Sequence, residues 1–152
     1  MRVINYTCTL VLLIASLTFS GCKEEGVDPK VAVLNKQRDV LMNGGKPWVL
    51  GTAGSVRKDN VDVSSQFAGF KLTIGNKTYA TQKSLSHVLK AIGTWEFKQS
   101  NPDKILMDGS TEVSVSHVNS ILTLKFNAIG EGSKGGRLNS VSGEYVFNLV
   151  SE

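Results

Sequence analysis

The sequence predicts an all-β protein, an eight-stranded antiparallel meander barrel with a short N-terminal helix. From position 46 onward, short segments alternate apolar and polar residues, the period of strands that bury one face. Turn residues such as Asp108-Gly109 separate these segments, as in a series of hairpins. There are eight such segments, the number at which an antiparallel sheet closes around side chains or one small ligand.

Residues 1–21 are expected to form a signal peptide. Arg2 supplies the positive start, and an apolar run follows from Leu10 to Ala15. Ser20-Gly21 then offers the small side chains that a cleavage site requires. The apolar stretch Thr9–Phe19 has about half of the roughly 20 residues that span a bilayer, so we expect cleavage and no permanent transmembrane helix.

The small pair Ser20-Gly21 before Cys22 resembles the lipobox of bacterial lipoproteins, in which the cysteine thiol is diacylated and becomes the new N-terminus. That pattern prefers Leu three positions before the cysteine, where this chain has Phe19. Lys23-Glu24-Glu25 is similar to the export signal of surface lipoproteins of the Bacteroidetes. These resemblances imply lipidation at Cys22, a lipidated tether over residues 22–29, and an outer-membrane lipoprotein held in the membrane by its lipid. The alternative is an ordinary secretory signal followed by a coincidental cysteine.

Residues 30–45 are expected to hold the N-terminal helix, and residues 46–152 the barrel domain. The helix ends at a glycine-rich stop, Asn43-Gly44-Gly45. Polar residues at its middle turn leave a narrow packing face. Its apolar residues recur near helical spacing at Val31, Leu34, Val40 and Leu41.

The strand pattern predicts where the eight strands lie. They are expected at Trp48–Val56, Phe70–Ile74, Lys77–Gln82, Gly93–Phe97, Ile105–Met107, Thr111–Val118, Ile121–Phe126 and Gly143–Leu149. The first strand should bend or bulge at Gly51 or Gly54.

Three connecting segments carry their own signals. Asp62–Phe67 predicts a single helical turn, capped by Asp62 or Ser64. Leu85–Ile92 has apolar residues at helical spacing and stays ambiguous between helix and strand. The glycine-rich stretch Gly130–Gly136 lacks the Lys-Ser/Thr pair and the following helix of a phosphate-binding loop. It predicts a hairpin loop, with the hypothesis that it covers a barrel mouth.

Charge and cysteine content exclude several classes of function. The formal net charge is +4, and it becomes +3 once Arg2 is removed with the signal. No basic cluster accompanies this charge, so we expect no nucleic-acid partner. Cys8 lies in the removed segment, and a lipidated Cys22 is blocked as a thioether. The mature domain therefore has no thiol nucleophile, disulfide or cysteine metal ligand.

Several strand sequences resemble the lipocalin-like lipoproteins of the Bacteroidetes. The matching stretches are Trp48-Val49-Leu50, Phe70-Lys71-Leu72-Thr73-Ile74, Lys77-Thr78-Tyr79, Gly93-Thr94-Trp95-Glu96-Phe97, Ile105-Leu106-Met107-Asp108-Gly109, Leu122-Thr123-Leu124-Lys125-Phe126 and Gly143-Glu144-Tyr145-Val146-Phe147. The resemblance covers Gly45–Leu149 and implies a cup-shaped barrel that holds a small hydrophobic or amphipathic molecule. It transfers no ligand residues. One departure is Lys83–Ile92, which is longer and more helical than expected and puts the shape of one rim in doubt.

The candidate ligand-binding residues are apolar side chains expected to point into the barrel: Trp95, Phe97, Leu124, Tyr145 and Phe147. Aromatic residues on alternating strands also serve as plain core, and both interpretations remain open. No residue is expected to bind a cofactor.

The remaining polar residues do not predict catalysis or a metal site. Ser116 and His117 are adjacent on a strand and point to opposite faces, so they cannot form a nucleophile–base pair. We expect His117 to be a hydrogen-bonded barrel residue and His87 an exposed loop residue. The acidic segment Asp59–Asp62 lacks the later glycine and carboxylate of a calcium loop, with Phe70 at the twelfth position.

Two hypotheses for function follow. The first is a non-catalytic, membrane-anchored cell-envelope lipoprotein whose barrel binds a small hydrophobic or amphipathic ligand. The alternative is a structural or interaction module, such as an accessory subunit of an envelope or polysaccharide-uptake complex, with a barrel filled by its own side chains. A cavity of a few hundred cubic ångströms favours the first, and a solid interior favours the second.

Overall fold

Antiparallel strands make up most of the computed structural model, which describes residues 28–52, 55–129 and 141–152. The helices are α1 (Pro29–Met42) and the short 3-10 helices η1 (Asn43–Gly45), η2 (Ser64–Phe67) and η3 (Lys98–Ser100). The strands are β1 (Trp48–Leu50), β2 (Val56–Lys58), β3 (Val61–Asp62), β4 (Lys71–Ile74), β5 (Thr78–Gln82), β6 (Ile92–Phe97), β7 (Lys104–Met107), β8 (Thr111–Val118), β9 (Ile121–Ala128) and β10 (Gly143–Ser151). The expected signal peptide, Cys22, Lys23-Glu24-Glu25 and the Gly130–Gly136 loop lie outside the described residues.

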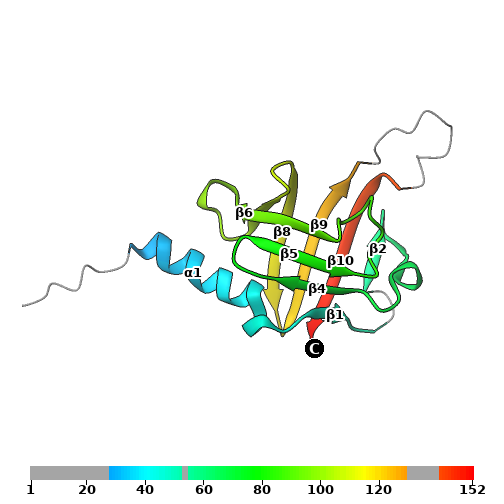
Figure 1. The fold of residues 1–152 in the computed structure, drawn as a ribbon, viewed down its shortest axis with the longest axis horizontal. Helices are drawn as coiled ribbons and strands as arrows, with labels where there is room; N and C mark the ends of the chain where they lie inside the picture. The colour runs from blue at the N-terminus through cyan, green and yellow to red at the C-terminus, as the bar shows by residue number, and fades with distance from the viewer. Residues whose placement is uncertain (1–27, 53–54, 130–140) are drawn as a thin grey trace, which may run out of the picture.

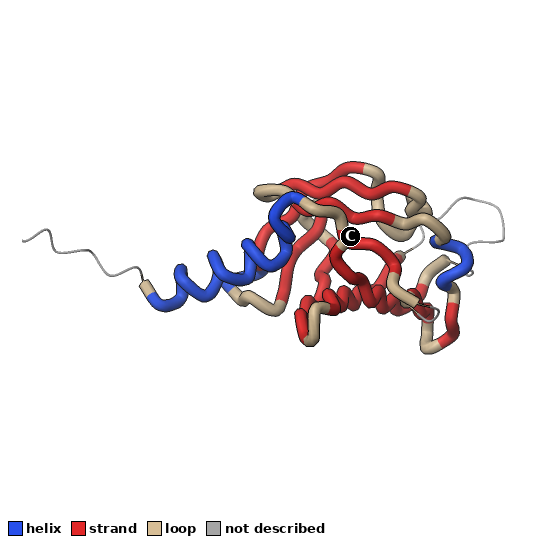
Figure 2. Tube along the Cα trace, turned by 90° about the horizontal axis from the view of Figure 1, so that it is seen from below, coloured by secondary structure: helices blue, strands red, loops and turns tan. Residues whose placement is uncertain are grey.

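The sheet closes on itself as a barrel (Figures 1 and 2). From β4 to β10, each strand pairs antiparallel with the next. Strand β1 closes the ring, because Trp48 pairs with Leu72 of β4 on one side and with Ser151 of β10 on the other. Strand β2 continues beside β10, so β1 and β2 together count as one strand. The predicted eight-stranded, lipocalin-like meander barrel is confirmed.

The first barrel strand is interrupted where the sequence predicts a bulge. Leu50 pairs with Leu149 and Val56 pairs with Phe147, so on β10 only Asn148 separates the two pairings. The Asn148 amide donates to the Ser55 carbonyl at 2.7 Å, which keeps the interrupted strand attached to β10. The break therefore begins at Gly51.

The barrel interior is packed with the apolar residues of the alternating strands. In β10, for example, Tyr145, Phe147 and Leu149 are all buried. Helix η2 adds Phe67, whose ring centroid lies 5.1 Å from that of Phe147, and Phe70 lies 5.1 Å from the same ring. The helical turn predicted here forms as η2, but the predicted cap is wrong: the N-cap position is Val63, which makes no side-chain capping bond, and Asp62 Oδ1 accepts from the Ser64 amide at 2.9 Å.

Helix α1 packs on the barrel through its C-terminal part (Figures 1 and 2). Leu41 is its one buried residue, and the Leu41 carbonyl accepts from Trp48 Nε1 at 2.8 Å. Asn43 takes the left-handed conformation that ends the helix, and its side chain donates to Ser151 Oγ at 2.9 Å. The Arg38 guanidinium lies 5.8 Å from the centre of the Phe97 ring. The rest of the helix projects away from the barrel, as its weak apolar face predicts.

Two further local expectations are corrected. Segment Leu85–Ile92 forms a turn followed by the start of β6, not a helix, because Val88 and Leu89 are buried at the end of the barrel.

The prediction of His117 as a hydrogen-bonded barrel residue is wrong. Strand β8 runs past its last pair with β7, at Ser114, so His117 lies beyond the core and is exposed. The centroid of its ring lies 5.9 Å from that of Trp48, with the two ring planes at 67°.

Candidate functional site

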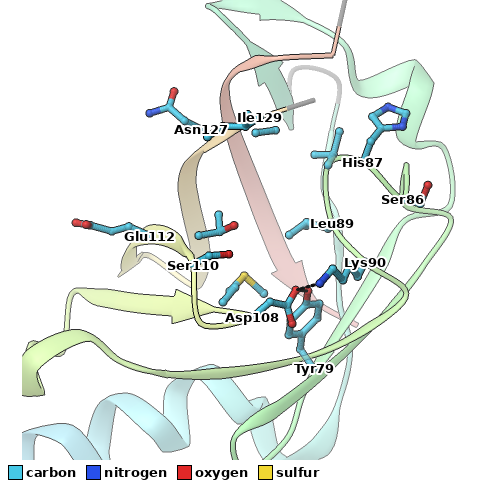
Figure 3. A pocket seen from close by; sticks show the side chains of 14 residues that line it. Tyr79, Ser86, His87, Leu89, Lys90, Asp108, Ser110, Glu112, Asn127 and Ile129 are labelled. Atoms are coloured by element: carbon cyan, nitrogen blue, oxygen red, sulfur yellow. Dashed lines mark hydrogen bonds and ion pairs between the residues drawn. The ribbon is translucent and has the colours of Figure 1, made fainter. Parts of the chain in front are cut away.

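A cavity of about 690 Å³ opens at the end of the barrel away from α1 (Figure 3). We call it the mouth pocket. It lies where β7 ends, β8 begins and β9 ends, whereas the C-terminal part of α1 contacts Phe97 at the opposite end of β6. Its lining residues are Tyr79, Ser86, His87, Val88, Leu89, Lys90, Met107, Asp108, Ser110, Thr111, Glu112, Asn127, Ala128 and Ile129.

One wall of the mouth pocket is apolar. It consists of Val88, Leu89, Met107, Ala128 and Ile129. The first four are buried, and Ile129 at the rim is 83% exposed. Two of these side chains come from the segment between β5 and β6, residues 83–91, which we call the strap.

The strap is fastened at its C-terminal end by a buried threonine. Thr81 Oγ1 donates to the Lys90 carbonyl at 2.8 Å, and the Thr81 amide donates to the Ala91 carbonyl at 2.8 Å. At its other end, the Val88 and Leu89 amides both donate to the Leu85 carbonyl. These bonds hold the strap across the barrel end with its apolar side chains turned inward.

The charged centre of the pocket is the Asp108 carboxylate. Tyr79 Oη donates to Asp108 Oδ2 at 2.8 Å, and the Thr94 amide donates to Oδ1 at 3.0 Å. Lys90 Nζ lies 3.5 Å from Oδ2 (Figure 3). Two of these partners belong to barrel strands, so the position of the carboxylate is fixed by the fold.

These contacts shift the acidity of both Tyr79 and Asp108. Burial, reinforced by the hydrogen bond to Asp108, raises the pKa of Tyr79 well above its ordinary value of 10.0. Partial burial opposes ionisation of Asp108, but the hydrogen bonds from Tyr79 and the Thr94 amide and the charge of Lys90 outweigh it. The pKa of Asp108 therefore lies below its usual value of 3.8. At neutral pH the pocket holds a phenol and a carboxylate anion.

Gly93 makes room for this pair of side chains. It lies opposite Tyr79 in the pairing of β5 with β6. A Cβ atom at position 93 would lie 2.3 Å from Asp108 Oδ1 and 2.5 Å from ring atoms of Tyr79. Glycine is thus required here by close approach across the strand pair, not by its backbone angles.

The other lining charge, Glu112, is already paired. Lys104 Nζ lies 2.7 Å from its Oε1, and Lys98 bonds its other oxygen. Hydrogen bonds from Lys104 and Lys98 lower the pKa of Glu112 to about 2. Figure 3 shows the Glu112 side chain pointing away from Asp108, so it does not add to the charge at the pocket centre.

The five candidate ligand residues lie in the packed interior or at its far end, and none lines the mouth pocket. Leu124, Tyr145 and Phe147 are buried, and Trp95 is fixed by a 2.9 Å bond from its Nε1 to the Gly75 carbonyl. Phe97 is half-buried beside α1. Their assignment to ligand binding stays a prediction.

The acidic residues of the described part of the chain are dispersed and make separate contacts. Within 28–52, 55–129 and 141–152, no three His, Cys, Asp or Glu side chains come together as a metal site. In the acidic segment, the Asp59 carboxylate accepts from the Glu144 amide at 2.9 Å. Over this part of the chain, no helix has the length and hydropathy of a membrane-spanning segment.

Comparison with known proteins finds no counterpart: neither a protein-family model, nor a curated protein, nor a solved structure matches the chain. The fold and the site therefore define the class: an eight-stranded, lipocalin-like barrel with a pocket at one mouth.

Proposed function

We propose that the protein is a non-catalytic cell-envelope lipoprotein whose barrel binds a small amphipathic molecule in the mouth pocket. The observation that carries this proposal is the 690 Å³ cavity, with an apolar wall and one fixed carboxylate. Pockets for small molecules commonly measure about 300–1,000 Å³ and combine apolar walls with a few placed polar groups. The volume and the lining both fit that description.

The apolar wall supplies the main driving force for binding. Val88, Leu89, Met107 and Ala128 line the pocket but each exposes at most 8% of its surface, so the exposed Ile129 offers most of the apolar surface from which a ligand would displace water. Each methylene buried there contributes about 0.8 kcal/mol, before the cost of immobilising the ligand is subtracted. A chain of several carbons therefore gives useful affinity without large rearrangement of the barrel.

The state of Asp108 supports binding without catalysis. A general acid or base works best when its pKa lies near the working pH. The pKa of Asp108 is lowered and its neighbour Tyr79 has a raised pKa, so neither exchanges a proton readily at neutral pH. Such a pair is suited to recognising a polar group.

The lipoprotein part of the proposal rests on the sequence before residue 28 and on the placement of α1. The helix has 14 residues, which gives a length of about 21 Å. Because only its C-terminal part packs on the barrel, it would hold the domain away from a lipid attached at Cys22. Metabolic labelling with a palmitate analogue tests this assignment: wild type should incorporate the label and Cys22→Ala should not. Incorporation retained by the variant would refute lipidation at Cys22.

Binding in the mouth pocket can be tested with a neutral apolar fluorophore, N-phenyl-1-naphthylamine. Two isoleucines give a matched pair of variants: Ile129 directly follows β9 and lines the mouth pocket, and Ile121 begins β9 at its other end. Both are exposed, so a larger side chain should leave folding intact. We expect Ile129→Trp to weaken binding of the fluorophore and Ile121→Trp to leave it unchanged. Equal effects of the two variants, or no binding by wild type, would contradict the proposal.

The packed aromatic interior favours a second candidate function. Phe67, Phe70, Phe126 and Tyr145 all contact Phe147, so the central barrel is filled by its own side chains. A barrel of this kind could act through its outer surface as an interaction module of the envelope. The fluorophore experiment separates the two, because the interaction module requires no occupied mouth pocket.

A further inference from the structure

The two charged groups at the centre of the mouth pocket differ in how firmly they are held. The Asp108 side chain is 19% exposed and accepts hydrogen bonds from Tyr79 and the Thr94 amide. The Lys90 side chain is 65% exposed. Its 3.5 Å separation from Asp108 Oδ2 is longer than the 2.9 Å of Lys125 with Glu144 and the 2.7 Å of Lys104 with Glu112. The anion is thus preorganised, and its cation is the exchangeable partner.

We propose that the mouth pocket takes an amphiphile with an ammonium head group, which replaces the Lys90 ammonium on Asp108 Oδ2. This inference rests on the proposed function and adds the chemical class of the ligand. The ammonium head group would take the position of the Lys90 ammonium and donate to the Asp108 carboxylate, which is already held in place. The apolar part would lie against Val88, Leu89 and Met107, which line the same cavity. The displaced Lys90 side chain, which is 65% exposed, would turn its ammonium toward solvent.

An anionic head group fits the same geometry less well. Lys90 is the one lysine or arginine among the residues that line the pocket, so it would be the partner of such a head group. An anion bound there would lie close to Asp108, because Lys90 Nζ is 3.5 Å from Oδ2. Like charges this close repel, and Asp108 cannot move away while Tyr79 and the Thr94 amide hold it. The arrangement therefore selects a cation by repelling an anion.

Three probes with one alkyl chain and different head groups test the inference: octylamine, octanol and octanoate. Binding to the full chain can be followed by NMR of methionine methyl groups labelled with carbon-13. Met107 lines the pocket and is the reporter, whereas Met42 ends α1 at the other end of the barrel and is the internal control. We expect all three probes to shift the Met107 signal, with octylamine bound about tenfold more tightly than octanol, as for one charge-assisted hydrogen bond.

Substitution of the two charged residues gives opposite expectations. Lys90→Met removes the competing cation and should tighten octylamine binding, while Asp108→Asn should reduce it to the level of octanol. An unchanged Met42 signal shows that each variant is folded. Tightest binding by octanoate, lost in Lys90→Met, would overturn the ammonium assignment and leave the proposed function standing. Failure of all three probes to shift Met107 would overturn the proposed function itself.

Discussion

The close contact at Gly93 gives the sharpest prediction about the site. In Gly93→Ala, the new methyl group would lie 2.3 Å from Asp108 Oδ1 and 2.5 Å from Tyr79 ring atoms. Either the Tyr79 ring or the Asp108 carboxylate must therefore move. Because Tyr79 is buried, movement of its ring would disturb the packing of the core. Overpacking of this kind costs about 1–3 kcal/mol.

The displaced pair also loses its hydrogen bond. A bond to a charged group contributes about 1.5–3 kcal/mol, whereas replacing glycine stabilises by about 0.4–1 kcal/mol through the unfolded chain. We therefore expect Gly93→Ala to lower the free energy of unfolding by about 3 kcal/mol. Tyr79→Phe removes the hydrogen bond without adding bulk and should cost about half as much.

Urea denaturation followed by tryptophan fluorescence measures these changes, because Trp48 and Trp95 are both buried. Gly51→Ala is the matched control. A Cβ there would meet only ordinary contacts, 3.6 Å from Val150 Cγ1 and 3.7 Å from Ser55 Oγ. We expect its stability to stay within about 0.5 kcal/mol of wild type. If Gly93→Ala were as stable as Gly51→Ala, the close packing described for Tyr79 and Asp108 would be wrong.

Three further predictions concern pH, the core and the helix. Because the pKa of Tyr79 is higher in the folded state than in the unfolded state, the free energy of unfolding should fall as pH rises above about 10. Urea denaturation across that pH range should show a smaller fall for Tyr79→Phe. Phe147→Ala should cost about 3–5 kcal/mol in urea denaturation, against about 0.5 kcal/mol or less for the exposed control Val118→Ala. Leu41→Ala should release α1 and speed amide exchange there while leaving β9 protected; equal exchange in both elements would contradict the docking of α1 through its C-terminal part.

The barrel could be predicted from the sequence because burial follows the strand period. In β10, every second residue from Tyr145 to Leu149 is buried, and the intervening residues are only partly covered. The helix stop at Asn43 and the single helical turn at Ser64–Phe67 could also be predicted, since both depend on local sequence. These features need no knowledge of distant contacts.

The strap shows where periodicity misleads. Leu85, Val88, Leu89 and Ile92 have helical spacing, yet Val88 and Leu89 are buried and Ile92 is 76% exposed. Burial of the adjacent residues Val88 and Leu89 at the barrel end determines the conformation of the strap, and the helical spacing of its apolar residues has no structural role. A short apolar run of this kind does not distinguish a helix from a turn that is packed by tertiary contacts.

The mouth pocket could not be predicted because its residues lie on turns and meet through tertiary structure. The sequence identifies Asp108 only as a turn residue before Gly109, and its hydrogen bond to Tyr79 spans 29 positions. One available signal was Gly93, a glycine within a predicted strand, which indicates close approach of another group. The partner in that approach is evident only from the register of β5 and β6.

Native mass spectrometry of the full chain, purified gently from cells that produce it, tests the central claim most directly. The mouth pocket predicts a co-purifying small molecule that disappears on denaturation. Ile129→Trp should lose this molecule and Ile121→Trp should retain it, because only Ile129 lines the pocket. A bare mass for wild type, or a molecule retained equally by both variants, would contradict ligand binding at the barrel mouth.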